Sequence, residues 1–189
     1  MKKLTILTVS MFLVLSFGQL KANSTITETR KEIKKEKIED KKSDRPALKK
    51  LEGTVVNQDS QTTFYMTLGN IPNISWTREV YFDVASYTKE GKEMKSFFDA
   101  NGQFVGTAIT IKATDLSSSI QKSIKKAYPD CIIGQAISYK DNEDNSTDMV
   151  MYDVQFDSQT QYFVEVTKGD SKFVVTCTAD GEVNLFKQL

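Results

Sequence analysis

The sequence predicts an exported α+β protein in which helices cover one face of an antiparallel meander sheet. Three observations lead to this expectation: a short apolar run behind two N-terminal lysines, several segments with strand alternation joined by tight turns, and only two segments with helical periodicity. The chain has 189 residues, with 25 basic and 25 acidic side chains and no histidine. Catalytic sites that depend on histidine are therefore excluded.

Residues 1–22 are predicted to form a signal peptide. Lys2 and Lys3 precede a mostly apolar stretch over residues 4–17, which is the pattern of a secretory signal. A membrane-spanning helix needs about 18 or more apolar residues, so we expect no integral membrane span in the mature protein. Cleavage after Gly18 and cleavage after Ala22 both fit the sequence. The pattern is typical of bacteria and predicts a periplasmic or secreted protein.

Residues 23–50 are predicted to form a charged, disordered linker, because they hold no aromatic residue and too few apolar ones to offset the entropy of ordering. Residues 28–50 carry a net charge of +4, whereas residues 51–189 carry a net charge of −7. An acidic folded part repels phosphate backbones, so we expect no nucleic-acid partner. The basic segment could tether the chain to anionic envelope polymers, although a solvated spacer is the simpler interpretation.

Residues 51–189 are predicted to form the folded part. Apolar and polar side chains alternate over residues 80–85, 152–157 and 173–178, which predicts strands. Glycine-containing turns follow at residues 90–91, 101–102, 168–170 and 180–181, which favours antiparallel hairpins. A helix is predicted over residues 115–128, with a capping Asp or Thr at its start and Pro129 just past its end. A shorter helix is predicted over residues 59–68.

The elements recur in the same order, which predicts two tandem units at about residues 57–112 and 113–189. Pro72 follows the first helix as Pro129 follows the second, and the two prolines are 57 positions apart. The turn glycines Gly102 and Gly181 are 79 positions apart. The excess of 22 residues in the second unit corresponds to about one extra hairpin, and the acidic insertion at residues 141–148 fits it.

Six short motifs carry a resemblance to a known family. They are Ile-Pro-Asn-Ile-Ser-Trp at 71–76, Val-Tyr-Phe-Asp-Val at 80–84, Phe-Phe-Asp-Ala-Asn-Gly at 97–102, Asp-Leu at 115–116, Tyr-Pro at 128–129 and Thr-Ala-Asp-Gly at 178–181. With these motifs, residues 60–189 resemble the beta-lactamase-inhibitor-like, PepSY-like domain of secreted bacterial proteins. The resemblance implies helices over one face of an antiparallel sheet and no catalytic residues. Relatives by fold include a hydrolase inhibitor and propeptide modules thought to restrain proteases.

Two Ser-x-x-Lys motifs, at residues 119–122 and 123–126, match a pattern of penicillin-recognising enzymes. The chain has no Lys-Thr-Gly segment to complete such a site, and both motifs lie away from the apolar stripe of the predicted helix or at its border. A solvated helix face explains them. We therefore predict that the protein is not an enzyme and needs no cofactor.

Asp141, Glu143, Asn145 and Asp148 form a dense run of oxygen ligands, so they are weak candidates for a calcium site. Ser146 and Tyr152 stand where an EF-hand loop needs glycine and glutamate. A polar hairpin tip explains the run better than a metal site does.

Cys131 and Cys177 could form a disulfide, because export permits one. Two strands are expected to lie between them, and bridged Cα atoms must lie within about 7 Å. Two buried thiols are therefore the favoured interpretation, with the disulfide left open.

The sequence predicts a non-catalytic protein-binding module whose partner is an envelope protein, as an inhibitor or regulator of an envelope hydrolase. The aromatic residues Tyr81 and Tyr87 are candidate contacts on an uncovered sheet face. The alternative is an envelope sensor for an ion or small ligand, with residues 141–148 as its receptor.

Overall fold

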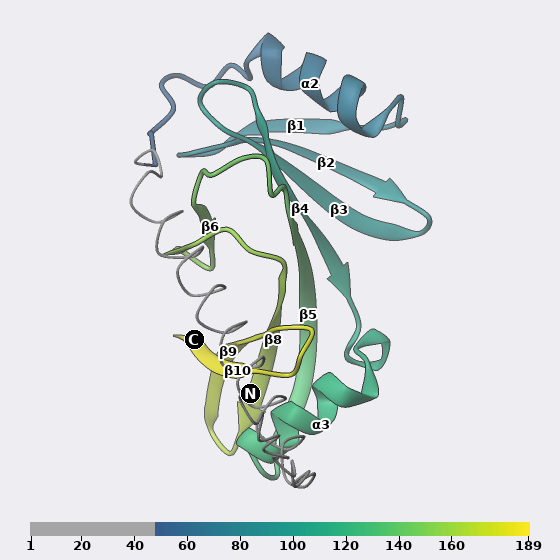
Figure 1. Ribbon diagram of the computed structural model, residues 1–189, viewed down its shortest axis with the longest axis vertical. Coiled ribbons are helices and arrows are strands. Elements are labelled where there is room, and N and C mark those ends of the chain that lie inside the picture. The colour runs from purple at the N-terminus through teal and green to yellow at the C-terminus, as the bar shows by residue number, and fades with distance from the viewer. Residues whose placement is uncertain (1–47) are drawn as a thin grey trace, which may run out of the picture. The chain divides into compact units, whose positions relative to one another are not determined.

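Residues 48–189 are described by the computed structural model and form an α+β fold around one large antiparallel sheet (Figure 1). The eight strands lie in the order β1-β2-β3-β4-β5-β8-β9-β10, and β6 and β7 form a separate pair. The predicted fold class is confirmed. The strands are β1 (Ser75–Arg78), β2 (Asp83–Lys89), β3 (Lys92–Phe98), β4 (Phe104–Ile111), β5 (Ile132–Asp141), β6 (Met149–Met151), β7 (Val154–Phe156), β8 (Gln161–Lys168), β9 (Ser171–Cys177) and β10 (Val183–Gln188). The helices are α2 (Gln58–Leu68), the 3-10 helix η1 (Ala113–Asp115) and α3 (Ser118–Ala127).

Both α-helices pack on the same face of the sheet. Phe64 of α2 lies in one apolar cluster with Ala85. Ile124 of α3 lies in another with Ala136. The strand registers join these two places, since Ala85 pairs with Ser96, Ser96 with Thr107 and Thr107 with Lys140, which shares its face of β5 with Ala136. The resemblance implied this one-sided arrangement. In the described residues, neither helix is long and apolar enough to span a membrane.

The opposite face is covered by the chain itself. Its centre is a cluster that includes the buried Val84, Phe97 and Phe163, and residues of β6 and β7 pack against this cluster together with Leu48. The expectation of an uncovered sheet face is therefore wrong over this area. The physical reason is the extra length of the second half, which carries the chain back across the sheet between β5 and β8.

Buried hydrogen bonds fix this covering segment, residues 142–160, to the sheet at both ends. Near its start, Asn145 Nδ2 and Thr147 Oγ1 donate to Asp99 Oδ2 over 3.1 and 3.3 Å. Near its end, the hydroxyl groups of Ser158 and Tyr139 lie 2.8 Å apart. The interpretation of residues 141–148 as a polar hairpin tip is therefore wrong, because Asn145 and Thr147 are buried.

Two of the four predicted glycine turns, at Gly102 and Gly181, have matching hydrogen bonds. Gly102 N donates to Asp99 O over 2.9 Å, and Gly181 N donates to Thr178 O over 3.0 Å. Each glycine has a positive φ and touches a helix: a Cβ on Gly102 would lie 2.7 Å from Asp59 Cβ, and one on Gly181 would lie 2.8 Å from Ser123 Oγ. Glycine therefore lets α2 and α3 sit directly on these turns.

Three predicted elements begin elsewhere. The strand expected over residues 80–85 begins at Asp83 and runs on to Lys89. The helix expected over residues 115–128 starts at Ser118, because Ser117 accepts the hydrogen bond from Ile120 N over 3.3 Å and Asp115 lies in η1. The strand expected over residues 152–157 is shorter, because Tyr152 and Asp153 have φ angles of 50° and 59° and form the turn between β6 and β7.

Cys131 and Cys177 are buried, free thiols. Only β8 lies between β5 and β9, so the expectation of two intervening strands is wrong. Separation along the strands keeps the thiols apart instead. Cys177 pairs with Tyr162 of β8, whereas Ile132, next to Cys131, pairs with Thr167. Five residues of strand correspond to about 17 Å.

Candidate binding crevice

The sheet forks between β3 and β4. Their ladder ends at the pair Met94–Ile109, yet both strands continue beyond it. Lys92 of β3 still pairs with Lys89 of β2, and Ile111 of β4 still pairs with Ala136 of β5. The two limbs of the fork therefore diverge, and each keeps only its outer neighbour.

A second open edge lies beside the fork. The ladder between β4 and β5 begins at Ala136, so residues 132–135 of β5 extend past the end of β4. On their other side, Ile132 and Ile133 pair with β8, and the register shifts between Ile133 and Ala136. Gly134 lies in this irregular stretch, and a Cβ placed on it would lie 3.3 Å from Glu165 O. Residues 132–135 therefore have strand neighbours on one edge only.

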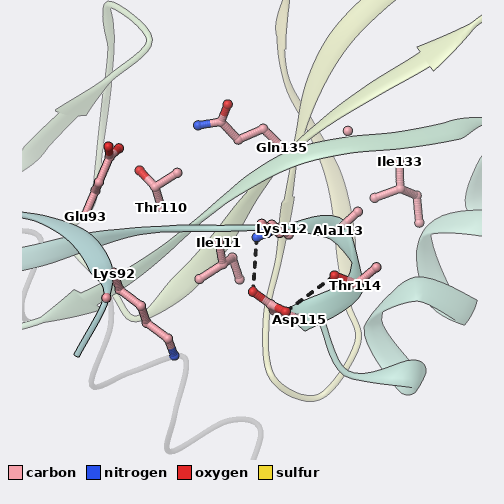
Figure 2. A pocket seen from close by; sticks show the side chains of 12 residues that line it. Lys92, Glu93, Thr110, Ile111, Lys112, Ala113, Thr114, Asp115, Ile133 and Gln135 are labelled. Carbon is pink, nitrogen blue, oxygen red and sulfur yellow. Dashed lines mark hydrogen bonds between the residues drawn. The ribbon is translucent and has the colours of Figure 1, made fainter. Parts of the chain in front are cut away.

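A cavity of about 710 Å³ occupies this junction, and we call it the crevice (Figure 2). Its walls are residues 91–93 at the start of β3, residues 110–112 at the end of β4, η1 and residues 133–135 of β5. Figure 2 shows the side chains of Glu93, Thr110 and Gln135 on one side of the strands and those of Lys92 and Ile111 on the other.

A smaller hollow of about 410 Å³ adjoins the crevice, because both are lined by Glu93 and Thr110. It continues along β2 and β3 toward Pro72 and Asn73, which precede β1. The two hollows together form an elongated depression rather than a single round pocket.

The charges around the crevice are mixed. Lys92 and Lys112 contribute two cations, and neither forms a salt bridge with any residue in the range 48–189. The carboxylate of Asp115 is engaged locally, accepting hydrogen bonds from Lys112 N and Thr114 Oγ1, each over 3.4 Å. Glu93 also lines the crevice, so two cations and two carboxylates balance there. The crevice is therefore locally neutral in a folded part with a net charge of −7, and it repels an anionic group less than that part as a whole does.

The walls of the crevice carry groups that can bind a ligand. Its walls supply hydroxyl, amide and charged groups, backbone at strand edges and the apolar side chains of Ile111 and Ile133. The lining residues include no cysteine, so no thiol nucleophile faces the cavity. This mixture of apolar walls with a few polar groups is typical of ligand sites, and the volume falls within their usual range.

The aromatic residues predicted to contact a partner have other positions. Tyr87 borders the smaller hollow but is only 6% exposed. Its ring packs edge-on against Phe64 of α2, 5.3 Å between centroids, and its hydroxyl lies 3.0 Å from Ser96 Oγ. The expectation that Tyr87 lies on an uncovered face is therefore wrong. Tyr81 is half-buried against the cluster beneath the covering segment and stays a predicted contact only.

The four candidate calcium ligands do not converge. Asn145 uses its amide nitrogen on Asp99 and its amide oxygen on Thr147 N, 2.8 Å away. Asp148 accepts a hydrogen bond from Gln155 Nε2 over 2.9 Å. Asp141 accepts one from Ser158 Oγ, and Glu143 joins no cluster. Among residues 48–189, no group of three or more acidic or cysteine side chains is arranged to hold a metal ion.

The charged pair of Arg78 and Asp83 was not predicted from the sequence. Arg78 donates Nε to Asp83 Oδ1 and Nη2 to Asp83 Oδ2, over 2.8 and 2.9 Å. Asn57 N and Ser60 Oγ also donate to Oδ2, over 2.8 and 2.9 Å. Burial alone would raise the pKa of Asp83, but these hydrogen bonds and the Arg78 charge together lower it. The pair ties the start of α2 to β1 and β2, a structural role.

The crevice was also missed by the sequence analysis. One signal for it exists, because Gly134 interrupts an otherwise strand-like run, Ile-Ile-Gly-Gln-Ala-Ile at residues 132–137. An isolated glycine in such a run indicates a bulge or a close backbone approach. The end of the β3–β4 ladder has no comparable signal, since it depends on how far two distant strands stay paired.

Comparison with known proteins supports the fold. No family model and no curated protein matches the sequence. Among solved structures, the chain is similar to a DUF2874 family protein from Bacteroides uniformis ATCC 8492, with 14% identity, a TM-score of 0.58 and coverage of 70% of this chain and 90% of that chain. It is also similar to a BLIP-like protein from Bacteroides fragilis NCTC 9343, with 18% identity, a TM-score of 0.54 and coverage of 71% and 86%.

A third similar structure comes from Bacteroides eggerthii DSM 20697 and is described provisionally as periplasmic. It shares 13% identity and a TM-score of 0.55, with coverage of 71% of this chain and 88% of that chain. At these identities the likeness establishes the fold alone. The BLIP-like neighbour agrees with the beta-lactamase-inhibitor-like part of the resemblance.

Proposed function

We propose that this chain is an exported protein-binding module without catalytic activity, and that its crevice holds an extended segment of a protein partner. The observation that carries the proposal is the fork of the sheet, where strand edges, apolar side chains and two lysines without salt bridges among residues 48–189 border one elongated depression. Such a depression offers more backbone contact than a small compact ligand could use.

The neighbours by fold support the location and the class of function. One is described as BLIP-like and another provisionally as periplasmic, and both descriptions fit the predicted signal peptide of this chain. We therefore propose that this chain is periplasmic or secreted. Regulation of an envelope hydrolase is the narrower form of the proposal, and it rests on analogy of fold.

We also infer that the two halves derive from one duplicated PepSY-like unit. Asn73 and Asp130, each directly after the proline that follows a helix, have positive φ angles of 57° and 61°. The matching hydrogen bonds at Gly102 and Gly181 are further support. These local agreements lie at positions related by the predicted repeat.

Site-specific photo-crosslinking in the envelope of the source cell tests the binding function. The full chain carries a photoreactive residue either at Thr114, which lines the crevice, or at Lys125, an exposed position on α3. We expect a protein adduct at Thr114 that is absent at Lys125. No adduct at either position, or the same adducts at both, would contradict the proposal. The narrower form requires in addition that the adduct is a hydrolase whose activity falls as the purified chain is added.

A further inference from the structure

We propose that the partner segment binds as an added β-strand against the open edge of residues 132–135 of β5, in the line that β4 leaves after Ile111. This inference deepens the proposed function and rests on it. Two observations support it: residues 132–135 have no neighbouring strand on one edge, and the crevice lies along that edge (Figure 2).

The backbone geometry supplies the binding groups. β4 pairs with β5 up to Ile111–Ala136 and then turns into η1, so the position of the next strand beside residues 132–135 is not filled by β4. An exposed strand edge presents N–H and C=O groups at every second residue. Four residues of strand extend about 13 Å, which gives an incoming chain a short template.

The irregularity in β5 hinders non-specific pairing of this edge with other strands. The register shift between Ile133 and Ala136 bends the strand at Gly134. Bulges of this kind hinder flat edge-to-edge pairing between copies of a protein. A partner must therefore match the bend and the side chains around it, which favours a specific segment over a second copy of this chain.

The side chains around the edge define the chemistry of that segment. Ile111 and Ile133 give it an apolar wall on the helix-bearing side. Lys92 and Lys112 flank the cavity without a salt bridge to residues 48–189 and balance Glu93 and Asp115 in its lining, whereas the folded part as a whole is acidic. A carboxylate on the ligand would therefore be placed beside these lysines. The expected ligand is an extended peptide that alternates apolar and polar residues and carries at least one carboxylate.

The first test uses linear twelve-residue random peptides displayed on phage, selected on the full chain. Enriched peptides are then measured against a Lys92→Glu/Lys112→Glu variant and against a matched variant, Lys122→Glu/Lys125→Glu, with the same charge change on the exposed face of α3. We expect acidic peptides whose affinity falls about tenfold or more in the first variant and little in the second. Circular dichroism confirms that both variants are folded.

The second test uses the unmodified chain and separates strand addition from other modes of binding. Hydrogen exchange of the backbone amides in residues 132–135 is measured with and without a saturating selected peptide. Strand addition is expected to slow exchange at alternate amides at least tenfold and to fail when the peptide is N-methylated at alternate positions.

Peptides that bind without slowing these amides would overturn strand addition and leave the binding function standing. A library that yields no peptide sensitive to the Lys92/Lys112 reversal would overturn it too. Failure of the crosslink at Thr114 concerns the proposed function itself, so the two failures are distinguishable.

Discussion

At the scale of single residues, the structure relies on a few buried polar groups whose partners come from distant parts of the chain. Asp83, fully buried, accepts hydrogen bonds from β1, from the cap of α2 and from α2 itself. Removing one member of such a buried set leaves the other polar groups buried without partners. The resulting loss of stability is larger than the stability that the intact set provides relative to apolar side chains in its place.

We expect Asp83→Asn to lower the free energy of unfolding by about 3 kcal/mol, because it leaves Arg78 without its counter-charge. Urea unfolding measures the loss, and Asp170→Asn in the exposed β8–β9 turn is the matched control. The pKa of Asp83 is lowered by folding, so its contribution is complete above the unfolded pKa of about 3.9 and disappears as pH falls through the lower folded value. A variant with the same acid sensitivity as the parent would contradict this role.

Burial also determines thiol reactivity. It raises the pKa of Cys177 to about 11, so only a small fraction is thiolate at pH 8. We expect the folded chain to react with iodoacetamide at Cys177 far more slowly than the urea-unfolded chain, which should label both cysteines. Mass spectrometry of labelled peptides gives the two rates. Equal rates, or an oxidised Cys131–Cys177 bond in the native protein, would refute the structure at this position.

At the scale of elements, the covering segment is the feature that most distinguishes the second half from the first. It crosses the helix-free face, buries part of it and is attached through Asp99 at one end and Tyr139 at the other. Burial within the large cluster and these polar contacts make it an integral layer of the described fold.

Asn145→Asp tests this attachment. The new carboxyl would face the Asp99 carboxylate and the Phe104 carbonyl, to which Asn145 Nδ2 now donates over 3.1 and 3.2 Å. We expect a loss of about 3 kcal/mol at pH 7. Repulsion raises the pKa of the new carboxyl in the folded state. The loss of stability therefore shrinks as the pH falls toward that raised pKa and the carboxyl becomes protonated.

Urea unfolding at pH 7 and at pH 5 measures this difference, with Asn70→Asp on the exposed surface as control. A loss that does not shrink at the lower pH would show that charge repulsion is not its cause.

At the scale of the whole molecule, the sequence is most informative where local chemistry decides the structure. The glycine turns at Gly91, Gly102 and Gly181 and the helices α2 and α3 follow from local propensity and are found close to their predicted positions. The covering segment and the fork depend on contacts between residues tens of positions apart. Alternation at residues 152–157 could not reveal that its first two residues form a turn, nor which face of which strands it would cover.

The contact between Asp99 and the covering segment also has a consequence for the order in which the chain can mature. Asn145 and Thr147 follow Asp99 by 46 and 48 positions. During synthesis from the N-terminus, α2 and strands β1 to β4 are complete while both of these donors are still missing. Closing such a long loop is slow compared with forming a local hairpin. The first half is therefore synthesised before the hydrogen-bond partners of Asp99 are available, and the second half supplies them.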